Sequence, residues 1–484
     1  MLHHWKHRGR LTRALADRLP ITSGLKVLSI MWIGQAVSMV GSGLTGFALS
    51  VHIYQQSGSV TNMASVSLSG SLPGILLLPF LGVLLDRWDR AFVLKASNIG
   101  AGICIFGLLL LLFTGHLTLW VICGLMAIRS VFIAVQGPAQ AAAATLLVSK
   151  QQLVRANGLT KSLVAGAQTV APLLAGLLLP IVHIPGILLI DVATYVVALV
   201  TLAIIRIPPP PAFKDEIASG TFLKDSVYGW KYIAARPPLK VLLTCGFVVN
   251  FGITFGQVLV TPIVLGFSTV EALGTIGSLG GAGMLAGSAV QSIWGGPISS
   301  IRGITGLGML IGFCVLCLGV LPSVWLIGAA SFGFWFVIPF SGAYVNAVWQ
   351  LKTAPAVQGR VFTTRLTIGR SAIPLAQFLA GPLADHFFQP LLVPGGPLTD
   401  SVGRVVGVGQ GRGAGLLLTL VGLLVVAVHI LVYRYTALRA LDDLPDLPDA
   451  TPAMTSAMAP TPTSTSTPAP ARVPGSAPAP EAPR

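Results

Sequence analysis

The chain alternates between long apolar runs and short polar connections. Runs of at least about 20 apolar residues, the length that crosses the hydrocarbon core of a bilayer as a helix, recur along most of it. The first six lie near residues 26–53, 59–85, 91–113, 117–148, 153–180 and 185–206, and the second six near 239–267, 270–298, 303–320, 323–350, 361–387 and 413–435. The pattern predicts an all-α polytopic membrane protein with twelve transmembrane helices.

The two sets of helices are separated by residues 207–238, which predicts two pseudo-symmetric six-helix bundles joined by a linker. The linker begins with four prolines and continues as TFLKDSVYGWKYIAARPP, an amphipathic stretch suited to lying on a membrane surface. We therefore expect a basic tail at 1–25, bundles at 26–206 and 239–436, and a tail at 437–484. The last segment is rich in Pro, Ala and Thr, a composition typical of disorder.

Charge is sparse and unevenly placed. The chain is 54% hydrophobic and 9% charged, with a net charge of +15 that would suggest nucleic acid in a soluble protein. Apart from Arg129, Arg404 and Arg412, every Lys and Arg falls on one side of the predicted helices. Because cytoplasmic loops carry the excess of Lys and Arg, that side is predicted to be cytoplasmic. We expect a multi-pass protein of the cell membrane with both termini inside, the lipid bilayer as its surroundings and no nucleic-acid partner.

Enzyme and cofactor signals are weak. All five cysteines lie in apolar segments and are interpreted as small buried side chains, and Cys314-x-x-Cys317 has no second pair to complete a metal site. The glycines of Gly407-x-Gly409-x-Gly411 imitate a phosphate loop without the preceding strand or the following Lys. The sequence predicts no enzyme, metal or cofactor, so an ion gradient or the substrate's own gradient would supply the energy.

Residues 82–94, GVLLDRWDRAFVL, place charges between two apolar runs. Gly82 permits close backbone approach, Asp86 suits the positive end of a helix, and Arg87 and Arg90 can hold a short loop. With Leu84, these positions resemble the signature loop between the second and third helices of major facilitator transporters.

That resemblance implies a gate in which Asp86 meets the inner end of the 361–387 helix. Arg360, Arg365 and Arg370 lie there, and Arg365 is the predicted partner. The alternative is that all three arginines are positive-inside anchors, which we prefer for Arg360.

The 153–180 helix carries a row of small residues and a proline. Small residues let a partner helix approach, and proline kinks a helix. The spacing resembles the antiporter motif of the same family, Gly-x8-Gly-x3-Gly-Pro-x2-Gly-Gly, with Ala at three Gly positions. The matching residues are Gly158, Ala167, Ala171, Pro172, Ala175 and Gly176. The resemblance implies export, and ordinary small-residue packing is the alternative.

Two charged residues fall deep inside predicted helices. An intramembrane charge costs at least about 2.5 to 3.5 kcal/mol on insertion scales, so Arg129 is expected to face a cavity or a partner. Asp191, within LLIDVATY, is the best candidate for an embedded acid, with ion coupling and structural pairing both open. Asp385, near the outer end of the 361–387 helix, is expected to be an interfacial group and not a proton carrier.

The macrolide-efflux branch of the major facilitator superfamily, which includes siderophore exporters, resembles the chain from residue 26 to 436. Segments such as GQAVSMVGSGLTGFALSVHIYQQSGS and GPLADHFFQPLL carry this likeness. In that family the first, fourth, seventh and tenth helices line the cavity. The resemblance therefore implies these substrate contacts: Gln35, Ser38, Met39, Gln136, Asn250, Gln257, Trp335, Phe336 and Asn346. Aromatics, amides and one cation suit a bulky amphiphile better than a sugar.

The resemblance implies a monomeric secondary active transporter that exports a hydrophobic or amphipathic small molecule by alternating access, in exchange for protons. Two alternatives stay open. The same fold permits an importer or facilitator of a nutrient. The basic surface and proline-rich tail would also suit a membrane scaffold that does not transport.

Overall fold

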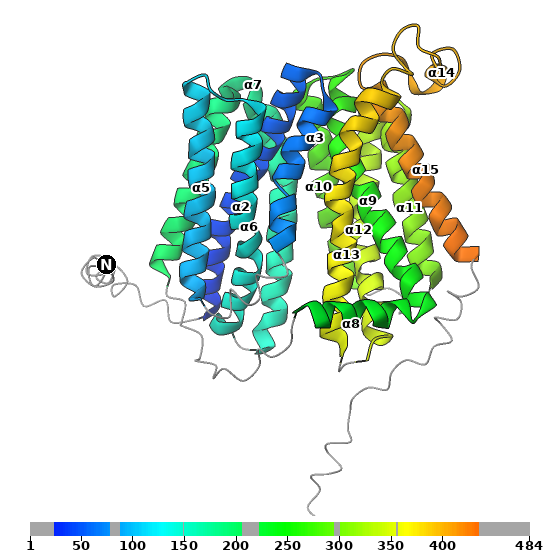
Figure 1. The fold of residues 1–484 in the computed structure, drawn as a ribbon. Coiled ribbons are helices and arrows are strands. Elements are labelled where there is room, and N and C mark those ends of the chain that lie inside the picture. The colour runs from blue at the N-terminus through cyan, green and yellow to red at the C-terminus, as the bar shows by residue number, and fades with distance from the viewer. Residues whose placement is uncertain are drawn as a thin grey trace, which may run out of the picture. The chain divides into compact units, whose positions relative to one another are not determined.

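The computed structural model describes residues 24–77, 88–148, 150–205, 222–294, 301–354 and 357–434. These residues belong to one contact unit, Met1–Pro445. Within the described ranges every regular element is a helix (Figure 1). The all-α prediction is therefore confirmed for this part of the chain.

The first half of the chain forms the helices on the left of Figure 1. They are α2 (Gly24–Ser57), α3 (Val60–Ser69), α5 (Arg90–Phe113), α6 (Leu119–Leu147) and α7 (Lys150–Ile204). The span that begins with α3 extends to Leu77 in the described residues. His183 has φ 53° and ψ −173°, so the α7 backbone breaks there and the element comprises two of the predicted helices.

The second half of the chain is also helical in its described residues. Its helices are α9 (Pro237–Leu265), α10 (Val270–Trp294), α11 (Ile301–Val320), α12 (Val324–Leu351), α13 (Gln358–Pro382), η3 (Leu383–Phe388), α14 (Gly403–Val406) and α15 (Arg412–Arg434). A π-helical segment, η3, continues α13 toward α14. Between the halves, α8 (Phe222–Ala234) lies across the end of the helices opposite α14 (Figure 1). We call these two ends the α8 end and the α14 end.

Ten helices in the described residues are long and apolar enough to cross a membrane. One of them, Leu163–Ile204, is 42 residues long, about twice the length that a single crossing needs, and it contains the break at His183. Arginines lower the hydropathy of α13, which nevertheless runs alongside the other helices in Figure 1. Counting α7 twice and adding α13 gives the predicted twelve.

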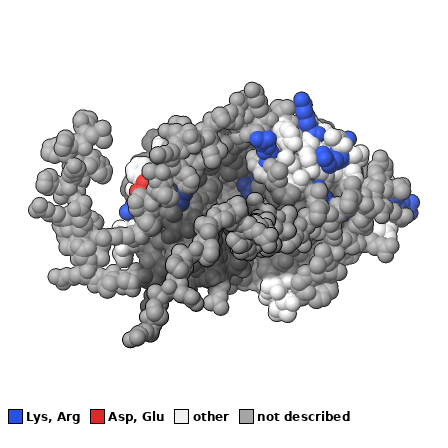
Figure 2. Space-filling model, turned by 90° about the horizontal axis from the view of Figure 1, so that it is seen from below, with Lys and Arg blue, Asp and Glu red and all other residues white. Residues whose placement is uncertain are grey.

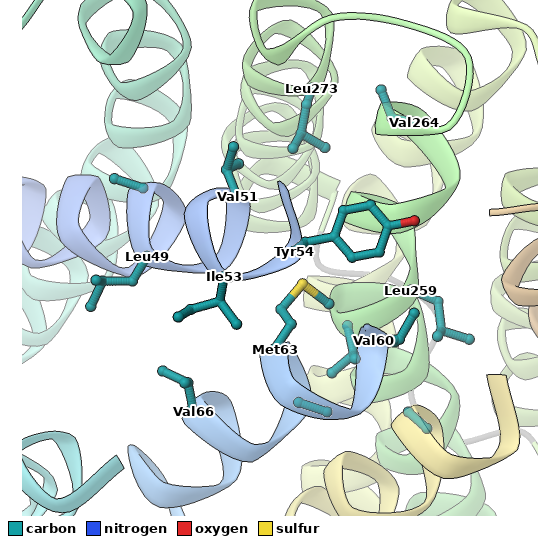
Figure 3. Close-up of a cluster of buried hydrophobic side chains, with 14 of the residues drawn as sticks. Leu49, Val51, Ile53, Tyr54, Val60, Met63, Val66, Leu259, Val264 and Leu273 are labelled. Carbon is teal, nitrogen blue, oxygen red and sulfur yellow. The ribbon is translucent and has the colours of Figure 1, made fainter. Parts of the chain in front are cut away.

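The two halves share an apolar core near the α14 end (Figure 3). The ring of Tyr54, at the end of α2, extends toward α9, where Leu259 and Val264 lie. Met63 of α3 and Leu273 of α10 belong to the same buried cluster. Apolar burial contributes about 25 cal/mol per Å² removed from solvent, so this cluster stabilises the contact between halves.

Large apolar side chains also remain on the outside of the helices. Trp120, Ile293 and Trp325 are each more than four-fifths exposed. Exposed apolar surface on this scale would be unfavourable in water and fits a lipid surrounding. The protein is accordingly a multi-pass membrane protein.

In the described part of the predicted linker lies α8, in which Trp230 is exposed and Ile233 is buried. Arg236 follows the end of α8, and its guanidinium lies 3.6 Å from the centre of the Tyr232 ring within that helix. Figure 2 views the molecule from below and shows Lys and Arg side chains of described residues gathered over one part of this face. The domain boundaries proposed from the sequence stay predictions.

The Gly-rich loop before α15 is built around backbone turns. Gly407, Gly409 and Gly411 all have positive φ, at 91°, 126° and 78°, a region that favours glycine. Arg412 is buried beside them, and its guanidinium donates to the carbonyls of Val406 and Ile263 at 3.2 Å each. The glycines therefore serve a loop that Arg412 fastens to the end of α9.

Candidate functional site

A cavity of about 380 Å³ lies between the two halves of the chain. Three of the predicted substrate contacts, Met39 of α2, Gln257 of α9 and Trp335 of α12, line it. Gln168 and Ser331 add polar groups to a lining that is otherwise mostly apolar, and no charged residue lines it among the described residues. An apolar cavity with a few polar groups is the usual form of a small-molecule site.

Other predicted contacts line a second cavity, of about 270 Å³, within the second half. Asn250 of α9 and Asn346 of α12 lie on its wall together with Arg365 and Arg370 of α13. Phe336 lines neither of the two cavities and instead stacks on Phe332, with ring centres 6.1 Å apart.

The predicted contacts of the first half are more buried. Gln140 donates its side-chain amide to the Gln35 carbonyl at 3.0 Å, and Ser38 is buried on the same helix as Gln35. The side-chain nitrogen of Gln136 is buried without a hydrogen-bond partner in the described part of the chain. As substrate contacts, all three stay predictions.

A larger cavity, of about 880 Å³, lies at the α14 end. It is lined by residues at helix ends, including His52, His183 and Glu271, and by none of the predicted contacts. In the described ranges, no group of three His, Cys, Asp or Glu side chains could hold a metal ion. We therefore place the candidate site in the 380 Å³ cavity.

The small residues of α7 meet α10 of the other half. A Cβ added to Gly274 would lie 2.7 Å from the Pro172 carbonyl oxygen and 2.8 Å from the Gly176 Cα. A Cβ on Gly277 would lie 2.7 Å from the Pro172 Cβ. Ala171 and Ala175 are buried on the same helix, as is Ala167, while Gly158 lies nearer its start. The glycines of α10, spaced as Gly274-x-x-Gly277, are partners that sequence reasoning missed.

Asp385 joins the halves at the α14 end. Its carboxylate accepts the backbone N–H groups of Val60 at 3.0 Å and Thr61 at 2.8 Å, and the hydroxyls of Ser59 and Thr61 at 2.7 and 2.8 Å. These donors form the N-terminus of α3, where a helix presents free N–H groups and partial positive charge. The sequence placed Asp385 at the membrane interface but did not supply this partner.

Two further contacts hold the span that begins with α3 against α13. Ser71 donates its hydroxyl to the Gln377 side-chain carbonyl at 2.5 Å, and a Cβ on Gly381 would lie 2.5 Å from the Thr61 Cα. The α3–α13 and α7–α10 contacts both lie toward the α14 end.

The two charges predicted inside the membrane belong to one buried polar network. Thr45 donates its hydroxyl to the Asp191 carboxylate at 2.7 Å, and Arg129 donates to the Tyr195 hydroxyl at 3.2 Å. Ser42 and Tyr195 share a hydrogen bond of 3.1 Å. Asp191 is 0% exposed and Arg129 is 6% exposed. The expectation that Arg129 needs a partner in the protein interior agrees with its bond to Tyr195.

Much of the predicted gating loop lies outside the described residues, including Gly82, Asp86 and Arg87. Arg90 begins α5 and donates to the Ala142 carbonyl at 2.9 Å, and Asp89 caps the helix by accepting the Ala91 N–H at 3.0 Å. The pairing of Asp86 with Arg365 stays a prediction.

Comparison with known proteins decides the family. The sequence model described as Major Facilitator Superfamily matches residues 31–377. The chain belongs to the Major Facilitator Superfamily. It is a membrane transporter and not an enzyme, since members of this family are transporters.

This major facilitator chain is similar to Macrolide efflux protein A of Streptococcus pyogenes, with 29% identity over 376 residues, covering 74% of this chain and 89% of that protein. It is also similar to Enterobactin exporter EntS of Shigella flexneri, with 27% identity over 339 residues, covering 68% and 78%. Its fold matches the crystal structure of a bacterial homologue of the human lysosomal transporter Spinster, with a TM-score of 0.63, 14% identity and coverage of 87% and 98%.

Proposed function

We propose that this transporter exports a hydrophobic or amphipathic small molecule. The observation that carries the proposal is the 380 Å³ cavity between the halves, with Met39, Gln257 and Trp335 on its wall. The names of the two curated relatives, an efflux protein and an exporter, support the direction.

Alternating access is the proposed mechanism. Two sets of close contacts join the halves toward the α14 end: Asp385 with the start of α3, and Pro172 and Gly176 of α7 with the glycines of α10. Release of a substrate toward that end would require both sets to separate. With the basic α8 end in the cytoplasm, this arrangement would be the state closed to the outside.

The test of export compares intracellular accumulation of a broad compound panel in cells with and without the protein. Higher accumulation of a compound in the cells that lack the protein supports export, and lower accumulation supports import instead. Trp335→Ala should raise accumulation toward the level without the protein. Trp325→Ala, at an exposed position outside the cavity lining, is the matched control.

We further propose that protons drive the export and that Asp191 carries them. A carboxylate with no exposed surface is costly when charged, and the bond from Thr45 offsets only part of that cost. Protonation would change its attraction to the Arg129–Tyr195 pair and so couple the proton to helix packing.

Efflux measured in inverted vesicles, with and without a pH gradient, tests the coupling. Transport by the wild type should depend on the gradient, and Asp191→Asn should remove that dependence. Asp400→Asn changes an exposed acid in the outer loop and should leave it intact. Gradient-independent transport by the wild type would contradict proton coupling.

A further inference from the structure

The 270 Å³ cavity of the second half has an unusual charge balance. Two arginines of α13, Arg365 and Arg370, lie on its wall, and no carboxylate does among the described residues. Arginine stays charged at every physiological pH. Arg370 is exposed, but Arg365 is partly buried, and a partly buried cation without a carboxylate is costly because burial removes water that would otherwise solvate it.

The Arg365 guanidinium lies 5.3 Å from the centre of the Trp349 ring, which is fully buried. In the described part of the chain, this ring is its one hydrogen-bonding, ionic or aromatic partner. A cation over an indole face gains some electrostatic stabilisation but uses none of its five N–H donors. No described residue accepts from these donors, so they can bind an acceptor in the cavity whenever the predicted Asp86 pairing is not formed.

Other polar groups on the wall are already engaged. Asn250 donates its side-chain amide to the Gly246 carbonyl at 3.0 Å. His429 is buried, and its Nδ1 lies 2.8 Å from the Val425 carbonyl oxygen, to which it donates. The two arginines are thus the strongest donors left for a ligand, and the apolar side chains of Val249 and Ile253 lie beside them.

We propose that Arg365 and Arg370 form a binding subsite for the anionic group of an amphipathic aromatic substrate, such as a carboxylate or a phenolate. The fork of N–H groups on arginine matches a planar carboxylate, and charge-assisted bonds of this kind are the stronger ones. The volume of about 270 Å³ holds a one- or two-ring aromatic acid and not a large macrocycle. This inference rests on the proposed transport function and names the substrate class as an organic anion.

The test uses equilibrium binding to the full-length protein in lipid nanodiscs, with empty nanodiscs as background. The probes are 1-naphthoate and its neutral analogue 1-naphthamide, which have nearly the same shape. Naphthoate should bind about tenfold more tightly or better, as expected for a charge-assisted contact. Arg365→Gln and Arg370→Gln should bring the two affinities together. Arg365→Lys keeps the charge without the fork and should retain part of the preference.

Arg404→Gln, at an exposed arginine of the outer loop, is the matched control and should change neither affinity. Circular dichroism and thermal unfolding of each variant establish that it is folded. Equal affinities for the two probes, no saturable binding of naphthoate, or a preference that survives in folded Arg365→Gln would each overturn the subsite and leave both arginines as membrane anchors.

Export is scored separately by accumulation in cells. A protein that exports neutral compounds without preferring naphthoate refutes only the subsite, and one that binds naphthoate but imports compounds refutes only the export.

Discussion

Asp385 accepts the backbone N–H of Thr61 at 2.8 Å, which places a carboxylate of η3 at the N-terminus of α3 in the opposite half of the chain. The two residues are 324 positions apart in the sequence. This bond and its three companions connect two elements that separate in the alternating-access mechanism proposed above. Substitution of Asp385 should therefore shift the equilibrium between the closed and open arrangements of the halves at the α14 end.

Asp385→Ala is expected to favour separation of the halves at the α14 end. Loss of a helix-capping side chain costs about 0.5 to 2 kcal/mol, so the closed population should fall by about 2- to 30-fold relative to the open one. Electron-electron distances between spin labels at Gln56 and Val393, both exposed at this end, should lengthen. Asp400→Ala is the control, and an unchanged distance distribution in Asp385→Ala would contradict a role for Asp385 in holding the halves together.

Gly274→Ala is expected to impair transport by forcing α7 and α10 apart. The added Cβ would meet the Pro172 carbonyl and the Gly176 Cα, which are backbone atoms that cannot rotate away. Gly166→Ala is the matched control, because a Cβ there meets nothing within 4 Å. Alanine is favoured over glycine in helices by about 1 kcal/mol, so the control should be neutral or more stable. Equal efflux rates in the two variants would contradict the idea that transport requires close packing of α7 against α10.

Thr45→Val is expected to destabilise the first half of the chain. Valine keeps the shape of threonine but removes the hydroxyl that donates to Asp191, and an unsatisfied buried acceptor costs about 1 to 3 kcal/mol. Thermal unfolding in detergent should show a lower midpoint. Thr244→Val removes an exposed hydroxyl that bonds only within its own helix, and it should unfold close to the wild type. An equal drop of the unfolding midpoint in both variants would mean that the buried bond to Asp191 does not stabilise the protein more than a bond within a helix.

Arg412→Gln is expected to loosen the loop before α15. The substitution removes the charged donor to the carbonyls of Val406 and Ile263, and bonds to charged groups contribute about 1.5 to 3 kcal/mol. Backbone hydrogen exchange across residues 392–411 should quicken by tenfold or more, an order-of-magnitude figure that follows from this energy. The exposed Arg404→Gln variant should exchange as the wild type does. Unchanged, slow exchange in Arg412→Gln would show that the glycine turns hold the loop without the arginine.

Several features of the site followed from residue type alone. The apolar runs predicted the helices because the bilayer demands about 20 residues per crossing wherever they pack. The small residues from Ala167 to Gly176 predicted close helix packing, and the structure places Pro172 and Gly176 of this row against α10. Arg129 and Asp191 were recognisable because a charge inside an apolar run is costly without a partner.

Partners were beyond the reach of the sequence. Nothing near Asp385 in the chain indicates the N-terminus of α3, and Arg129 gives no sign of Tyr195, 66 positions away. The predicted substrate contacts were also divided in space: Met39, Gln257 and Trp335 line one cavity, and Asn250 and Asn346 another. Knowing which helices face a cavity does not fix how each helix is rotated.

The sequence by itself determined the membrane-spanning architecture and the superfamily, because hydropathy and motif spacing are properties of neighbouring residues. Only the tertiary structure decided which charges meet, which glycines touch across the halves, and that two arginines share a cavity in which no described residue is a carboxylate. The physical reason is that these are contacts between distant segments. Their energies depend on distance and burial, and both are set when the helices pack.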